Sequence, residues 1–104
     1  MSLLKINPFE IAARKNRPLI LDGAIGSELQ KLGVDTSTPL WSSIANLTSP
    51  NLVAKLHQDY ISAGADIITT NTFRTNPSVV KYSKFSSCSK LVIAAVKLAL
   101  DASR

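Results

Sequence analysis

Cysteine is almost missing from this sequence, since Cys88 is the only one among its 104 residues. A single cysteine cannot form an internal disulfide, and it cannot by itself form a structural zinc site. Long apolar runs are missing too. The longest one near the C-terminus, residues 91–96, is far below the roughly 20 residues that a membrane helix needs. The first residues also lack an apolar core next to a small-residue cleavage site, so we expect no secretory signal and a cytoplasmic location.

Aromatic residues make up only 6% of the chain, and acidic residues number 7 against 12 basic ones, for a net charge of +5. The basic excess lies at the two ends, in residues 1–17 and 81–104, whereas residues 18–80 are mildly acidic. A nucleic-acid site favours a dense basic patch interleaved with aromatics. Only Tyr82 and Phe85 lie among the C-terminal lysines. We therefore interpret the lysines as solvated surface and expect neither a nucleic-acid nor a membrane partner.

The apolar content of 45% suits one globular domain and is too high for a disordered chain. A short amphipathic helix or turn is expected within residues 3–15, where Asn7 can start the helix and Pro8 can occupy its first position. The sequence Asn16-Arg17-Pro18 interrupts this pattern. We divide the chain into a lead-in, residues 1–17, and a domain, residues 18–104.

Two short apolar segments are typical of buried parallel strands. Residues 18–21 end at the turn Asp22-Gly23, and residues 65–70 are rich in β-branched side chains. In other parts of the chain, apolar residues recur at the spacing of a helix. Helices are expected at 27–32 with Ser27 as cap, at 50–63 with Ser49 as cap, and after the cap Ser89. Loops are expected at 34–48 and 71–77, and residues 78–88 are Ser/Lys-rich and loosely patterned.

Strands that alternate with helices predict an α/β fold with parallel pairing. The connection between the two segments exceeds 40 residues, which is long enough for a right-handed crossover. In such folds, ligands bind at the carboxyl ends of the strands. Those ends are residues 22–26 and 70–73, so the candidate site is expected there.

The first of these ends offers an acid and two glycines. Asp22 can bind an ammonium group or act as a base, or it can cap the following turn through its own side chain. Gly23 and Gly26 allow the backbone to approach a ligand closely. The spacing is not the dinucleotide fingerprint and no P-loop lysine follows, so nucleotide binding has little support.

The second end carries hydroxyl and amide groups, in residues 69–72. They can bind a small polar ligand, or they can bond locally to the backbone. His57 has no second ligand nearby, which is more typical of packing or surface than of chemistry. Cys88 has no partner base and is expected to be a plain thiol. Trp41 is either core filler or a lid over a ligand.

Together, four stretches resemble the homocysteine S-methyltransferase family, in order and in spacing. The resemblance runs from about Pro18 to Pro77 and continues loosely to the end. Its Leu40-Trp41-Ser42-Ser43 stretch looks most like family members that use S-methylmethionine or S-adenosylmethionine. The other stretches are residues 21–29, residues 50–60, and residues 63–73.

The resemblance implies the N-terminal portion of a (β/α)8 TIM barrel, about two βα units long. It implies methyl transfer from a sulfonium donor to the sulfur of homocysteine, giving methionine, with a zinc ion that holds the thiolate. Asp22 matches the acid that binds the substrate amino group, and Thr70 matches a threonine that contacts substrate. Gly23 and Ala24 would bring backbone close to the amino-acid part of homocysteine. Trp41 matches a tryptophan near the pocket.

The family's zinc is held by three cysteines, and Cys88 matches none of them. We therefore expect this chain alone to bind no zinc and to have no methyl transfer activity. Two alternatives remain at this point. The chain could be an inactive, truncated binding or regulatory fragment whose open strand edges favour self-association or docking on full-length subunits. It could also be an unrelated small α/β domain with a phosphate-binding loop at residues 23–26.

Overall fold

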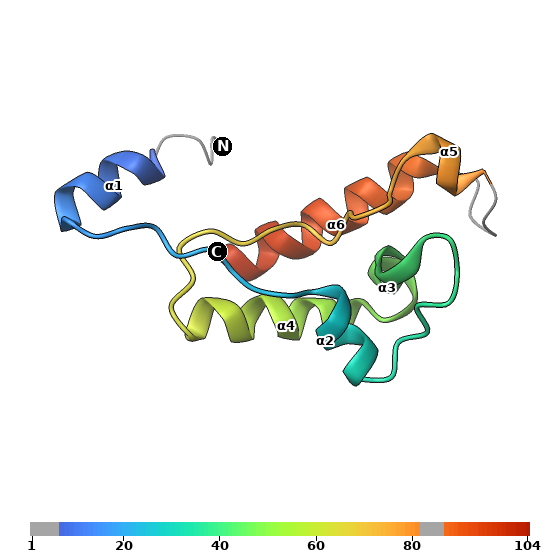
Figure 1. The fold of residues 1–104 in the computed structure, drawn as a ribbon. Helices are drawn as coiled ribbons and strands as arrows, with labels where there is room; N and C mark the ends of the chain where they lie inside the picture. Colours follow the sequence, from blue (N-terminus) through green and yellow to red (C-terminus); the bar gives the residue numbers. More distant parts are fainter. Residues whose placement is uncertain (1–6, 82–86) are drawn as a thin grey trace.

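The computed structural model describes residues 7–81 and 87–104. The remaining parts of the expected first helix and of the loosely patterned segment 78–88, including Tyr82 and Phe85, lie outside the described residues. The described chain is mostly helical (Figure 1). Its elements are α1 (Pro8–Lys15), α2 (Gly26–Lys31), the 3-10 helix η2 (Trp41–Ile44), α3 (Ala45–Thr48), α4 (Pro50–Ser62), α5 (Pro77–Val80) and α6 (Cys88–Ser103).

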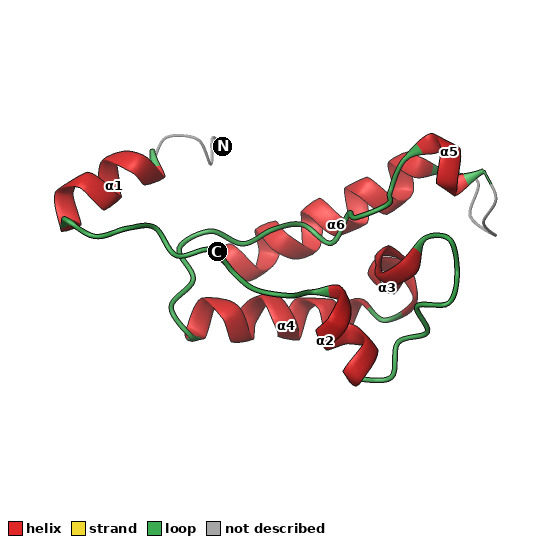
Figure 2. Cartoon of the chain, viewed as in Figure 1, coloured by secondary structure: helices red, strands yellow, loops and turns green. Residues whose placement is uncertain are grey.

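The predicted α/β fold, as part of a TIM barrel with two βα units, is wrong for this structure. The described residues contain helices and loops but no assigned strand (Figure 2). The two expected strands do come together in parallel, but only Leu21 and Ile67 form a bridge. The Asp22 amide donates to the Ile67 carbonyl at 2.9 Å, and the Ile67 amide donates to the Ile20 carbonyl at 3.2 Å.

Two aspartate side chains account for this short pairing. The Ile20 amide donates to Oδ2 of Asp66 at 2.9 Å, and the Thr69 amide donates to Oδ2 of Asp22 at 2.8 Å. In a regular parallel ladder, these amides would donate to main-chain carbonyls of the facing segment. The carboxylates therefore replace the ladder on both sides of the bridge. Because the described chain has no strand, the expected self-association through strand edges loses its structural basis.

The two helices with the clearest start patterns were predicted correctly. Asn7 caps α1, and its Oδ1 accepts a hydrogen bond from the Phe9 amide at 2.9 Å. Helix α4 begins at Pro50, directly after Ser49, although the Ser49 side chain makes no capping hydrogen bond. Gly64 follows the end of α4 with a φ of 112°. That left-handed angle favours glycine.

Other helix boundaries differ from the prediction. Ser27 lies inside α2 and makes no capping bond. Helix α6 is capped by Ser87 rather than Ser89, and the Ser87 hydroxyl accepts from the Lys90 amide at 3.2 Å. The expected loop 34–48 contains η2 and α3, and α5 begins at the last residue of the expected loop 71–77.

Two apolar clusters hold the helices together. The first joins α2, α3 and α4, and the second joins α5 and α6 to the residue before η2. Helices α4 and α6 lie side by side (Figure 1), and Nε2 of Gln58 donates to the Ala102 carbonyl at 3.3 Å. The buried members are Leu29, Val34, Ala45, Val53 and Leu56 in the first cluster and Leu40, Val80 and Leu91 in the second.

Helix α1 stands apart from the other helices and buries none of its residues (Figure 1). The molecule measures 46 × 29 × 20 Å. Within the described residues, no helix has the length and apolar character needed to cross a membrane.

Candidate functional site

A cavity of about 270 Å³ lies where the two predicted strand ends meet the start of η2. Three residues predicted for the site line it, namely Ala24, Trp41 and Thr70. Asp22 and Gly23 do not line it but precede Ala24 directly. The full lining consists of Ala24, Ile25, Gly26, Ser27, Trp41, Ser42, Thr69, Thr70, Asn71, Thr72 and Phe73.

Asp22 connects the two segments that form the site. Its carboxylate accepts hydrogen bonds from the Thr69 amide at 2.8 Å and from Oγ1 of Thr69 at 3.0 Å. The Asp22 side chain therefore bonds the distant Thr69 instead of capping its own turn. An ionised carboxylate has about four lone-pair positions, so these two bonds leave capacity for a ligand that donates.

The turn after Asp22 rests on a tyrosine of α4. The Tyr60 hydroxyl donates to the Ala24 carbonyl at 2.7 Å. A Cβ atom added to Gly23 would lie 2.8 Å from Oη of Tyr60, so glycine permits this close approach. Partial burial, with the carboxylates of Glu28 and Asp22 nearby, raises the pKa of Tyr60. The hydroxyl therefore stays protonated as a donor.

Trp41 and Phe73 form an aromatic wall of the cavity. Their ring centroids are 5.7 Å apart, and the rings meet edge to face at 74°. The backbone of Trp41 has a φ of 52°, a left-handed value that a bulky side chain rarely adopts. Such a conformation persists only where the surrounding structure holds the residue in place. A Cβ atom on Gly26 would lie 2.5 Å from the Trp41 ring. Trp41 is thus a half-buried wall residue rather than core filler.

Asn71 joins the second strand end to η2 and α3. Its side-chain amide donates to the Ser42 carbonyl at 2.9 Å, and its Oδ1 accepts from Oγ of Ser42 at 3.2 Å. Nδ2 of Asn46 donates to the Asn71 carbonyl at 2.7 Å. These groups are buried, so Asn71 shapes the cavity through internal bonds. The sequence grouped Asn71 with potential ligand contacts and did not reveal this role.

Three threonines lie at or just after the end of the second apolar segment, and their hydroxyl groups have different partners. Thr70 and Thr72 both line the cavity, and their hydroxyl oxygens lie 2.9 Å apart. The hydroxyl of Thr69 is bonded to Asp22. All three threonines line the cavity, but the Thr69 hydroxyl is also bonded to Asp22, whereas among the described residues the hydroxyls of Thr70 and Thr72 are bonded only to each other.

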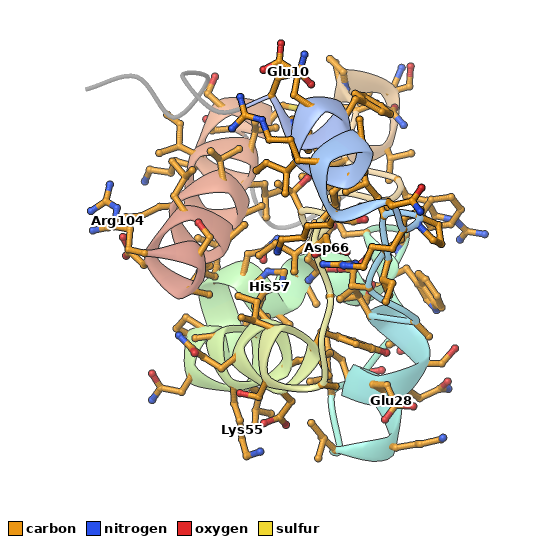
Figure 3. All side chains as sticks on the ribbon, turned by 90° about the vertical axis from the view of Figure 1, so that its left-hand side faces the viewer. Glu10, Glu28, Lys55, His57, Asp66 and Arg104 are labelled. Carbon is orange, nitrogen blue, oxygen red and sulfur yellow. The ribbon has the colours of Figure 1, made fainter. Side chains whose placement is uncertain are left out.

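His57 is fully buried on α4, and its side chain points inward, whereas Lys55 of the same helix points outward (Figure 3). Within the described part of the chain, neither ring nitrogen has a hydrogen-bond partner. Burial lowers the pKa of His57, against the opposite effect of the Asp22 charge. The ring does not line the cavity, so the structure favours the packing interpretation.

The zinc site that the resemblance implies does not fit these residues. Across residues 7–81 and 87–104, no three His, Cys, Asp or Glu side chains gather closely enough to hold a metal. Cys88 begins α6 and packs against the second apolar cluster. A three-cysteine centre cannot be built from the single cysteine of this sequence.

Comparisons with known proteins agree with the resemblance. The family model described as Homocysteine S-methyltransferase matches residues 19–104. Homocysteine S-methyltransferase 3 of Zea mays is 38% identical over 86 residues, which are 81% of this chain and 25% of the relative. Selenocysteine Se-methyltransferase of Brassica oleracea var. italica is 46% identical over 55 residues, which are 53% of this chain and 16% of the relative.

The chain thus spans about a quarter of the length of the Zea mays relative. The match also removes the alternative of an unrelated phosphate-binding domain, since residues 23–26 lie inside the matched region. This chain belongs to the homocysteine S-methyltransferase family and represents part of its domain.

Proposed function

We propose that this chain supplies the homocysteine-binding part of a homocysteine S-methyltransferase, with residues 1–17 as a lead-in and residues 18–104 as the partial domain. The complete enzyme would transfer a methyl group from S-methylmethionine or S-adenosylmethionine to homocysteine and give methionine. One observation carries the proposal. The carboxylate of Asp22 and the cavity wall at Ala24 and Thr70 come together from two distant segments.

Each predicted residue has a role that its position supports. Asp22 binds the substrate ammonium with the lone pairs that Thr69 leaves free. Gly23 and Ala24 present their backbone to the amino-acid part. The Thr70 hydroxyl adds a polar contact, and the Trp41 ring packs against the side chain of homocysteine.

Methyl transfer also needs a group that takes the proton of the substrate sulfur. The substrate sulfur must lose its proton, attack the methyl carbon of the sulfonium donor and form a new carbon–sulfur bond. The old bond breaks, and its electron pair stays on the donor sulfur as a neutral thioether. Among the described residues that line the cavity, none is a His, Asp, Glu or Lys that could take the proton. The proposal therefore assigns binding, and not turnover, to this chain alone.

The binding role is tested by the Asp22→Asn substitution, with L-homocysteine titrated calorimetrically. Loss of the charged hydrogen bond to the ammonium should weaken binding roughly tenfold. Asp35→Asn is the matched control, because the Asp35 carboxylate also accepts a backbone amide bond, from Ser37 at 2.9 Å, but lies outside the two segments that form the site. Equal affinity of the Asp22→Asn variant and the unchanged chain would contradict the assignment.

The absence of turnover is a separate prediction. Homocysteine and S-methylmethionine, with added zinc, should give no methionine above the background without protein. Methionine is measured by chromatography after derivatisation. Turnover that persists in a Cys88→Ser variant would show that the chain contains a complete catalytic centre, against the prediction.

A further inference from the structure

The turn at residues 22–25 has unused hydrogen-bond donors. In the described structure, the amides of Gly23, Ala24 and Ile25 donate no hydrogen bond, whereas the Asp22 amide is bonded to the Ile67 carbonyl. Free consecutive amides suit an anionic group. A carboxylate acceptor therefore lies next to a row of donors. This pair matches the ammonium and the carboxylate of an α-amino acid.

Tyr60 fixes the orientation of this row. Its hydroxyl donates to the Ala24 carbonyl at 2.7 Å, so that carbonyl points towards α4. The peptide bond between Ala24 and Ile25 is trans, like the others described. In a trans peptide, the amide N–H points opposite to the carbonyl. The Ile25 amide therefore points away from α4, and Ile25 lines the cavity.

We propose that Tyr60 is a positioning residue for the substrate carboxylate. By holding the Ala24 carbonyl, it aims the Ile25 amide at the carboxylate while Asp22 binds the ammonium. The proposal rests on the proposed homocysteine site and adds a residue that does not line the cavity. The ring of Tyr60 packs against the first apolar cluster, so the hydroxyl can be removed while the packing stays.

The test uses Tyr60→Phe in the full chain, with L-homocysteine and its decarboxylated analogue 3-aminopropanethiol as probes. Loss of the hydroxyl should weaken homocysteine binding about fivefold and leave the analogue unaffected. Gln58→Met is the matched control, because Gln58 also lies on α4 and donates to a distant backbone carbonyl, at Ala102. That variant should bind both probes like the unchanged chain.

A second measurement does not depend on any variant. In the amide NMR spectrum of the unchanged chain, saturating homocysteine should shift the Ile25 resonance strongly. A chain that binds homocysteine without moving this resonance, or a Tyr60→Phe variant that weakens both probes equally, overturns the proposal. If the unchanged chain binds no homocysteine at all, the proposed function fails as well, which distinguishes the two failures.

Discussion

At the scale of single residues, charged side chains replace backbone pairing. Arg17 donates to Asp66 through two bonds, at 2.7 and 2.8 Å, while Asp66 accepts from the Ile20 amide. The Arg17 guanidinium holds the pKa of Asp66 well below its usual range. At the other end of the bridge, the Asp22 carboxylate likewise accepts a backbone amide, that of Thr69. The sequence identified Asp22 as important but not its partner, because Thr69 lies 47 positions away.

A pH dependence follows from His57. Burial lowers its pKa below the ordinary value of about 6.5, so the folded chain favours the neutral ring. The unfolded chain binds a proton more readily, and stability should therefore fall as the pH drops through 6.5 towards the lowered pKa.

Urea unfolding at pH 7.5, 6.5 and 5.5 measures this effect. The unchanged chain should lose stability over that series, and His57→Leu should lose less, since no buried imidazole then has to be charged. A His57→Leu variant with the same pH slope as the unchanged chain would assign the dependence to another group.

At the scale of elements, the residues that start and stop helices predicted helices better than short apolar segments predicted strands. Asn7, Pro50 and Gly64 act within a few residues of their own positions, and α1 and α4 were predicted correctly. The segments 18–21 and 65–70 need partners along their whole length to become strands. Helices η2, α3 and α5 are at most four residues long, too short for a periodic pattern to reveal.

The cap of α6 provides a test at this scale. Ser87→Ala removes the acceptor of the Lys90 amide and should lower the free energy of unfolding by about 1 kcal/mol. Ser89→Ala is the matched control, because Ser89 is exposed inside the first turn and should change stability little. Both values come from urea unfolding at constant pH. A larger loss for Ser89→Ala would support the cap that the sequence suggested.

At the scale of the whole molecule, the chain is less compact than a globular domain of similar length. Its radius of gyration is 14.8 Å, compared with about 13 Å for a compact domain of 100 residues. Large apolar side chains remain exposed, with Leu21 at 63%, Phe73 at 65% and Ile93 at 66%. The cavity is lined by polar and aromatic side chains, and no three His, Cys, Asp or Glu side chains gather among the described residues to hold a metal.

The central claim is that residues 22–25 and 69–73 together form one homocysteine site. It is tested most directly by titrating the isotope-labelled chain with L-homocysteine and following backbone amide resonances. We predict that the amides of residues 22–25 and of Thr70 shift together and saturate at one ligand concentration, while those of α6 stay in place. Saturable shifts confined to other residues, or no saturable shift, would contradict the account.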